Sequence, residues 1–141
     1  MIITENIKGQ RYQQLIELLA SQCNRFAFVE NRQLMADEEL RLAIVGELIV
    51  DIGDQFIERK IQRKWETTWL GEGTAYVFYF ILNDITAQFL KDHSYSLFDW
   101  VYPKLPEDLM FYRDDQCLLA ACSHEGFFRV DENLWNSFIL S

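Results

Sequence analysis

The chain has few of the residues that interrupt or cross-link a fold. Its 141 residues include two prolines, six glycines and three cysteines. Three cysteines cannot form a full disulfide framework, which argues against a small secreted protein of the disulfide-rich class. No linker rich in proline, glycine or serine and no internal repeat divides the chain. We therefore expect one domain that covers residues 1–141.

Long apolar runs are also absent. The longest apolar segment extends from Ala75 to Leu82, whereas a bilayer-spanning helix needs roughly 20 apolar residues. The first six residues lack the basic start and the extended apolar core of a signal peptide. We therefore expect a cytoplasmic protein with reduced thiols and no membrane partner.

Positive charge is scarce. The chain carries 22 acidic side chains against 13 Lys and Arg, for a formal net charge of −9. Binding to nucleic acid or anionic lipid needs clustered Lys and Arg, so this balance argues against both partners. One basic cluster lies beside Trp65 and Trp69, an association also found in proteins that bind single-stranded nucleic acid. The strongly negative field favours a solvated face for this cluster: Arg59, Lys60, Arg63 and Lys64.

The chain does have enough apolar surface for a core. Half of its residues are hydrophobic and 15% are aromatic. Helical spacing of apolar residues predicts helices near 10–22, 37–52, 84–93 and 131–139, and a helical turn near 97–102. Alternating or continuous apolar runs predict strands at 25–30, 65–69, 76–82, 109–112, 117–123 and 127–130. The predicted fold class is α+β, with helices packed on a mainly antiparallel sheet.

Three of these elements rest on specific patterns. The helix near 37–52 begins with acids that suit its N-terminal dipole, and its expected buried stripe is Leu40, Ile44, Leu48 and Ile52. Residues 56–64 fit either a helix or a strand, and 65–69 is predicted as a strand that turns at 70–73. The strand 76–82 is apolar on both faces, as in a strand covered on both sides. A second copy of the chain is one alternative source of that cover.

One short run offers nucleophilic chemistry. On a strand, Cys122 and His124 would face the same side, and such a pair can form a nucleophile and its base, with Glu125 as an orienting group. A small buried thiol beside a strand-end histidine is the more ordinary interpretation. The chain has no CxxC or HExxH motif, and Cys117 and Cys122 should face opposite sides of one strand. We therefore predict no metal site and no cofactor.

Acidic side chains occur as adjacent pairs in segments expected to be loops or caps. From Asp84 onward, the chain has ten acidic residues and only four basic ones. Such acids can form a face that steers a basic partner toward the protein, with exposed aromatic side chains as anchors. The predicted acidic residues are Glu107, Asp108, Asp114, Asp115, Asp131 and Glu132, and the predicted anchors are Trp100, Tyr102 and Tyr112.

A tryptophan, a Leu-Pro-Glu-Asp-Leu run and a later His-Glu form a recognisable pattern, here at Trp100, 105–109 and 124–125. Over residues 76–130 the chain resembles a group of small uncharacterised bacterial proteins, some of them labelled stage III sporulation protein AH-like. That resemblance implies no catalytic residue. In its small size, its acidity and its lack of motifs, the chain is similar in type to immunity proteins that neutralise bacterial toxins.

The function we expect is non-enzymatic binding. The most concrete form is an immunity protein whose acids meet the basic surface of a toxin domain, for example a nuclease. Two alternatives stay open: a small enzyme that uses Cys122 and His124, and a regulatory subunit that assembles with copies of itself.

Overall fold

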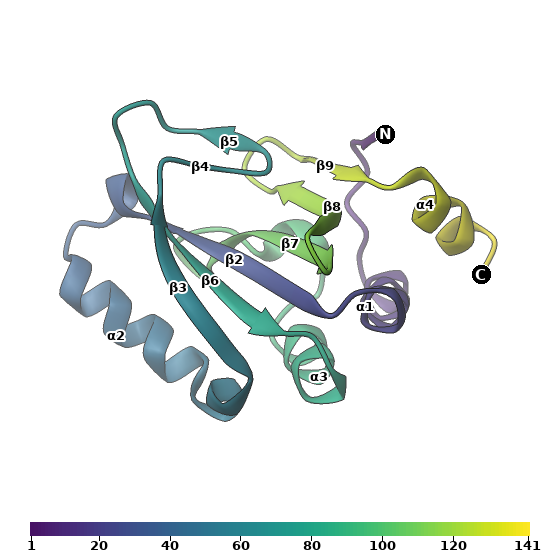
Figure 1. Ribbon diagram of the computed structural model, residues 1–141, viewed down its shortest axis with the longest axis horizontal. Coiled ribbons are helices and arrows are strands. Elements are labelled where there is room, and N and C mark those ends of the chain that lie inside the picture. The colour runs from purple at the N-terminus through teal and green to yellow at the C-terminus, as the bar shows by residue number, and fades with distance from the viewer.

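The computed structural model describes residues 1–141 and has an α+β fold. Its centre is a seven-stranded sheet in the order β1-β9-β8-β7-β2-β6-β3, with every neighbouring pair antiparallel (Figure 1). The sheet strands are β1 (Ile2–Ile3), β2 (Arg25–Asn31), β3 (Phe56–Gln62), β6 (Ala75–Ile81), β7 (Glu107–Arg113), β8 (Gln116–Cys122) and β9 (Phe127–Val130). A separate small hairpin consists of β4 (Lys64–Trp65) and β5 (Thr68–Trp69).

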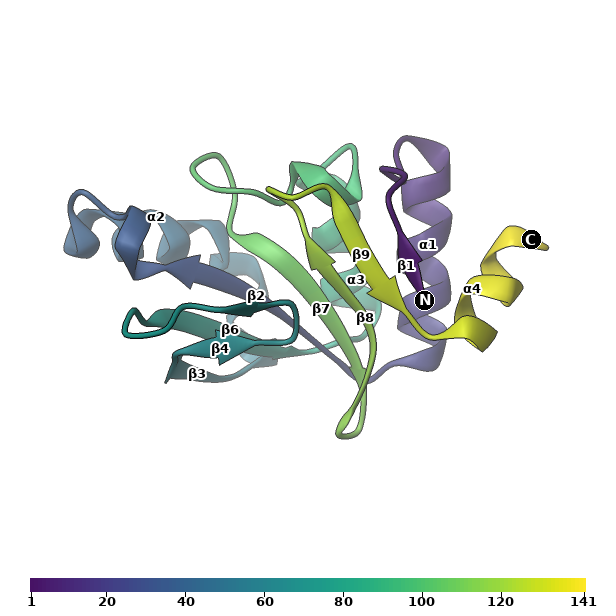
Figure 2. The ribbon, with the colours of Figure 1, turned by 90° about the horizontal axis from the view of Figure 1, so that it is seen from above.

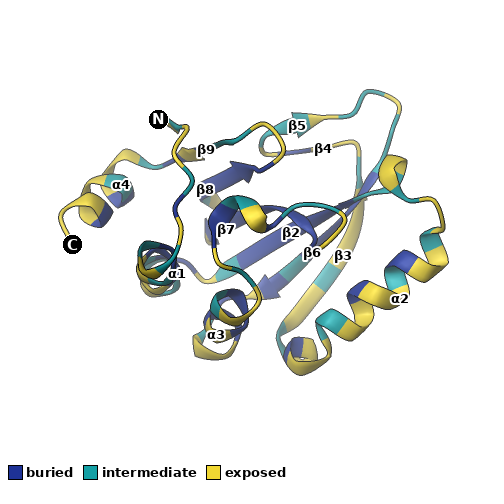
Figure 3. Cartoon of the chain, turned by 180° about the vertical axis from the view of Figure 1, so that it is seen from behind, coloured by how far each residue is buried: buried dark blue, intermediate teal, exposed yellow.

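The helices and the hairpin cover opposite faces of the sheet (Figure 2). The larger core cluster takes side chains from all four α-helices, whereas the smaller one lies under Trp65 of the hairpin. Figure 3 shows that the inner strands are buried and that exposed residues concentrate on edge strand β3. The helices are α1 (Gln10–Gln22), α2 (Glu38–Leu48), α3 (Asp84–Asp92) and α4 (Glu132–Ile139), and the 3₁₀ helices are η1 (Arg32–Leu34), η2 (Val50–Gln55) and η3 (Leu97–Asp99).

The predicted fold class is confirmed, and most elements lie where their periodicity places them. Helix α1 buries the apolar face expected of it, and the hairpin β7–β8 turns at residues 114–115. Helices α3 and α4 begin at side-chain caps. The side-chain Oδ1 of Asn83 accepts from the backbone N–H groups of Ile85 and Thr86. The carboxylate of Asp131 accepts from the backbone N–H of Leu134. Each cap pairs an N–H group that the helix itself leaves without a partner.

The stripe predicted for the second helix is wrong at two of its four positions, whereas Leu48 packs partly buried against the core and Ile52 is buried. Leu40 is 59% exposed and Ile44 is 50% exposed, while Arg41 and Val45 are buried. Helix α2 also ends at Leu48, so that Ile52 is buried from η2 instead. The reason is an ion pair, because Arg41 must face the sheet to reach Glu30. The buried face of the helix is therefore shifted by one residue from the predicted stripe.

The segment after α2 is also split differently from the prediction. Residues 56–62 form edge strand β3, and the predicted strand 65–69 is interrupted by a turn at Glu66 and Thr67. The turn allows Trp65 to lie against the sheet, whereas Trp69 is 76% exposed. Local polarity could not show this, because Trp65 is held by a residue far along the chain.

Strand β6 is covered by its own chain. It pairs with β2 and β3, and its side chains enter both core clusters. The expectation that a second copy covers part of this strand therefore loses its basis. No helix of the structure combines the length and the apolar character needed to span a bilayer.

Candidate functional site

A buried ion pair positions the start of β7. The Arg41 Nε and Nη2 atoms donate to the two carboxylate oxygens of Glu30, at 2.5 and 2.9 Å. The same guanidinium donates to the backbone carbonyls of Pro103 and Leu105, at 2.6 and 3.3 Å. Arg41 thus ties α2, β2 and the segment before β7 together, and Glu107 follows directly.

Strand β7 opens with a bulge that turns two carboxylates inward. Ala27 pairs with Met110 and Val29 pairs with Glu107, so β7 has one extra residue there. Asp108 has a φ of 59°, in the left-handed region that Asp enters more readily than most residues. Such bulges redirect side chains at sheet positions that neighbouring strands would otherwise fix.

The prediction that Glu107 and Asp108 belong to an exposed acidic face is wrong. Glu107 is 3% exposed and Asp108 is 0% exposed. Asp108 accepts from the backbone N–H of Ser123 at 2.9 Å and from the Trp65 indole at 3.0 Å. These two bonds hold β7 against the β8–β9 turn and against the hairpin.

Burial also changes how these carboxyls ionise. It raises the pKa of Glu107 to about 7, with a further contribution from the charges of Asp108 and Glu30. Burial raises the pKa of Asp108 as well, and the donors from Ser123 and Trp65 counteract it. One oxygen of Glu107, Oε1, has no hydrogen-bond partner, which is uncommon for a buried carboxylate.

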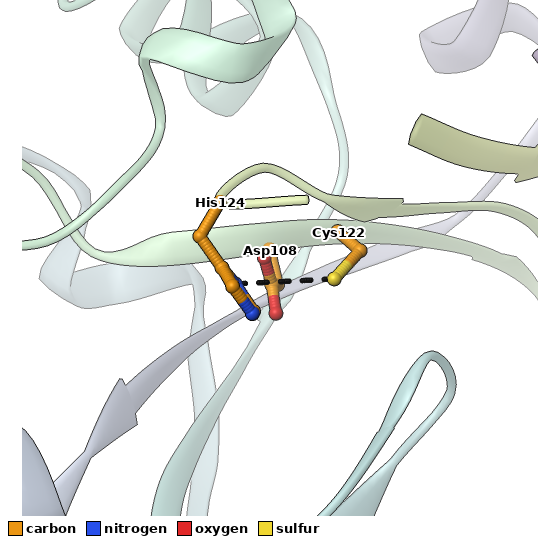
Figure 4. A group of neighbouring side chains, drawn as sticks. All are labelled: Asp108, Cys122 and His124. Carbon is orange, nitrogen blue, oxygen red and sulfur yellow. Dashed lines mark hydrogen bonds between the residues drawn. The ribbon is translucent and has the colours of Figure 1, made fainter. Parts of the chain in front are cut away.

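Cys122 and His124 lie close together, as their spacing predicted. The Cys122 sulfur is 3.9 Å from Nδ1 of His124, and Asp108 lies beside both (Figure 4). Burial, together with the carboxylates of Asp108 and Glu125, raises the pKa of the Cys122 thiol to about 11. An activated nucleophilic thiol has a lowered pKa, so this environment does not favour the enzyme alternative.

Cys122 and His124 line none of the five main surface hollows of the molecule, which measure about 260 to 520 Å³. Glu125, the orienting group expected from the sequence, has a side chain that is 62% exposed and lies 4.0 Å from Nε2 of His124, so it makes no hydrogen bond to the ring. The group of Asp108, Cys122 and His124 nevertheless places three metal-ligating atoms within 4.8 Å of one another.

Sequence reasoning missed Asp108 as a member of this group. Its contact with Cys122 and His124 joins residues far apart along the chain, and no local motif marks it.

The two cysteines of β8 also differ from expectation. A register shift at Cys117 places that residue against the cluster under the hairpin, and Cys122 contacts Thr68 of the same hairpin. Both thiols therefore face the hairpin.

Two of the three predicted aromatic anchors are core residues. Trp100 is fully buried, and its indole N–H donates to the Tyr12 hydroxyl at 2.9 Å. Tyr112 is also buried, under the hairpin. Tyr102 is half-buried, with the Arg41 guanidinium 4.5 Å from its ring centre. Aromatic side chains of this size contribute most where they are buried, and here the chain buries them itself.

The remaining predicted acids lie at the surface, at the opposite end of β7. Asp114 and Asp115 form the β7–β8 turn, and Asp131 and Glu132 begin α4. The backbone N–H of Asp131 donates to the Leu118 carbonyl at 2.8 Å, which brings the start of α4 beside β8. Asp114 has a local structural role, because its carboxylate accepts from the Asn24 side chain at 2.9 Å.

A hollow of about 450 Å³ lies between these segments. We call it the acidic groove and define it by the carboxylates that line it, those of Glu66, Asp115 and Asp131. Arg129 lines it too and pairs with Glu66 at 3.2 Å. Glu66 belongs to the turn of the β4–β5 hairpin, and no sequence pattern placed it near the other acids.

The basic cluster behaves as a solvated face. Arg59 lies over the ring of Tyr76, and Lys60 lies over that of Tyr79 and pairs with Glu58 at 3.4 Å. The structure thus offers two arrangements, the inward Asp108, Cys122 and His124 group and the outward acidic groove.

Comparisons of the chain with protein-family models, with curated proteins and with solved structures found no match.

Proposed function

We propose that the protein is a non-catalytic binding protein that recognises a basic surface on a protein partner through its acidic groove. The observation that carries this proposal is that three acidic residues, from the hairpin, the β7–β8 turn and the start of α4, line one hollow in which Arg129 is the one basic lining residue. Arg25 pairs with Asp115 at 3.8 Å without lining the hollow. Carboxylates gathered in a concave surface focus their field and raise the rate at which a cationic partner associates.

The class of partner follows from this charge. Proteins that act on nucleic acid carry clustered Lys and Arg for contact with phosphates, and the acidic groove is complementary to such a cluster. A toxin domain of the nuclease type, neutralised by an immunity protein, is the partner we propose. The formal charge of −9 over the whole chain acts in the same direction.

The test neutralises the groove without changing its shape. We expect a triple variant, Glu66→Gln with Asp115→Asn and Asp131→Asn, to associate with the partner about tenfold more slowly or worse, with a weaker dependence on salt. Asn at position 131 still caps α4. The partner is first captured on the wild-type protein from a lysate of the source organism and eluted with salt, and the association rates are then measured with the purified pair.

A matched control removes the same charge elsewhere. Glu47→Gln, Asp51→Asn and Asp54→Asn are exposed changes around the end of α2 and η2, and none of these residues lines the groove. We expect this variant to associate nearly as fast as the wild type. An equal loss of association rate in both variants would show that overall charge, and not the groove, sets the rate. An unchanged rate in the groove variant would also contradict the proposal.

A further inference from the structure

Three different metal-binding side chains meet where β7 and β8 lie side by side. The Cys122 sulfur and the His124 Nδ1 atom are 3.9 Å apart, and a carboxylate oxygen of Asp108 is within 4.8 Å of each (Figure 4). Two ligands on one tetrahedral zinc ion are ~3.5 Å apart, given the usual Zn–S and Zn–N bond lengths. The three donors are therefore near the spacing that a shared ion requires.

The carboxylate of Glu107 lies beside His124 without a full set of partners. The Glu107 Oε2 atom is 3.7 Å from the same Nδ1 of His124. The Glu107 residue is 3% exposed, and its Oε1 atom accepts no hydrogen bond. A buried oxygen of this kind normally has a partner, and a cation bound by the Glu107 carboxylate would provide one.

The Asp108 donor is also held as metal ligands usually are. Asp108 accepts from the Ser123 N–H and from the Trp65 indole, which fixes its carboxylate. If Nδ1 binds the ion, Nε2 keeps its hydrogen, and Glu125 lies 4.0 Å from that atom. The N–H donors to Asp108 act as the hydrogen bonds that orient ligands in known metal sites, whereas Glu125 is beyond hydrogen-bond distance of the imidazole.

We propose that Asp108, Cys122 and His124, with Glu107 as the fourth donor, form a binding site for a divalent transition-metal ion of the zinc type. The thiol and imidazole favour zinc over magnesium or calcium, which prefer oxygen alone. The His124 side chain is half exposed and offers the route of entry. The bound ion would clamp the β8–β9 turn to the bulge of β7. This site is separate from the acidic groove, so neither proposal depends on the other.

The experiment titrates Co²⁺ and then Zn²⁺ into the purified, chelator-treated protein. We expect one equivalent of Co²⁺ to produce the absorption bands of a tetrahedral site and a thiolate-to-cobalt charge-transfer band, and Zn²⁺ to remove both. Cys122→Ser should abolish the charge-transfer band. His124→Asn should weaken Zn²⁺ binding, measured by chelator competition, by more than the ~10-fold that follows loss of an outer partner.

Matched controls use the other thiols and the other histidine. Cys117→Ser and His93→Asn should leave the stoichiometry, the spectrum and the affinity unchanged, and circular dichroism confirms that each variant is folded. Because His124 is half exposed, its substitution provides a test even where Cys122→Ser is unstable. A wild-type protein without a charge-transfer band would overturn the proposal. So would a band that survives Cys122→Ser or binding that survives His124→Asn.

Discussion

The ion pair of Glu30 and Arg41 is the most consequential polar contact in the core. The Glu30 side chain is 0% exposed, and both its oxygens accept from the guanidinium. The same guanidinium holds the backbone at Pro103 and Leu105. Three segments that are distant in sequence thus depend on one side chain.

Arg41→Met should therefore destabilise the protein strongly. It leaves the Glu30 carboxylate buried without a cation, for which a loss of roughly 3–5 kcal/mol in the free energy of unfolding is expected. Urea unfolding followed by circular dichroism measures this loss. The double variant Glu30→Leu with Arg41→Met should recover much of it, because apolar side chains replace buried ion pairs at little cost. A single variant as stable as the wild type would show that the pair is not buried in solution.

The members of the candidate sites differ in how far the sequence could reveal them. Cys122 and His124 are two residues apart, so a local pattern was enough to bring them together. Glu107 and Asp108 were assigned to the surface because acids are mostly exposed. Their burial depends on a bulge and on donors from Ser123 and Trp65, and none of these is visible in the local sequence.

Helix α2 gives a direct test of which of its faces packs on the sheet. Val45 is 1% exposed, whereas its neighbour Ile44 is 50% exposed. Val45→Ala should lower the free energy of unfolding by roughly 2 kcal/mol, through lost methyl burial and the cavity left behind. Ile44→Ala removes more atoms, yet it should change stability by less than about 0.5 kcal/mol, as is usual at a surface. Denaturant midpoints of the two variants measure the contrast. The reverse order would restore the stripe predicted from the sequence.

The elements recovered from the sequence are those with a strong period or a clear cap. Helix α1, strand β6 and the caps at Asn83 and Asp131 follow from side chains within a few positions. Where the prediction was wrong, a distant partner decided the outcome. Arg41 reaches across to Glu30, and Trp65 bonds to Asp108, so that the predicted strand 65–69 became a hairpin.

Strand order belongs to the whole chain and could not be predicted. Strand β2, early in the sequence, is an inner strand between β6 and β7, next to the central strand β7. The two residues of β1, near the N-terminus, pair with β9 near the other end of the chain. The antiparallel character was predicted and the β7–β8 hairpin forms, but β6 pairs with β2 and β3 and not with residues 65–69. The inner position of β2 agrees with its burial on both faces, where its side chains alternate between the two core clusters.

This arrangement predicts a gradient of backbone protection across the sheet. Strands β3 and β6 are seven residues each and pair with one another, but β3 is an edge with mostly exposed side chains and β6 is an inner strand. In hydrogen exchange followed by mass spectrometry, the amides of β2, β6 and β7 should exchange slowest and those of β3 markedly faster, because edges open without the rest of the fold. The protection of β6 should not change with protein concentration, since its own chain covers both of its faces. Protection of β6 that increased as the protein was concentrated would mean that a second copy supplies the cover after all.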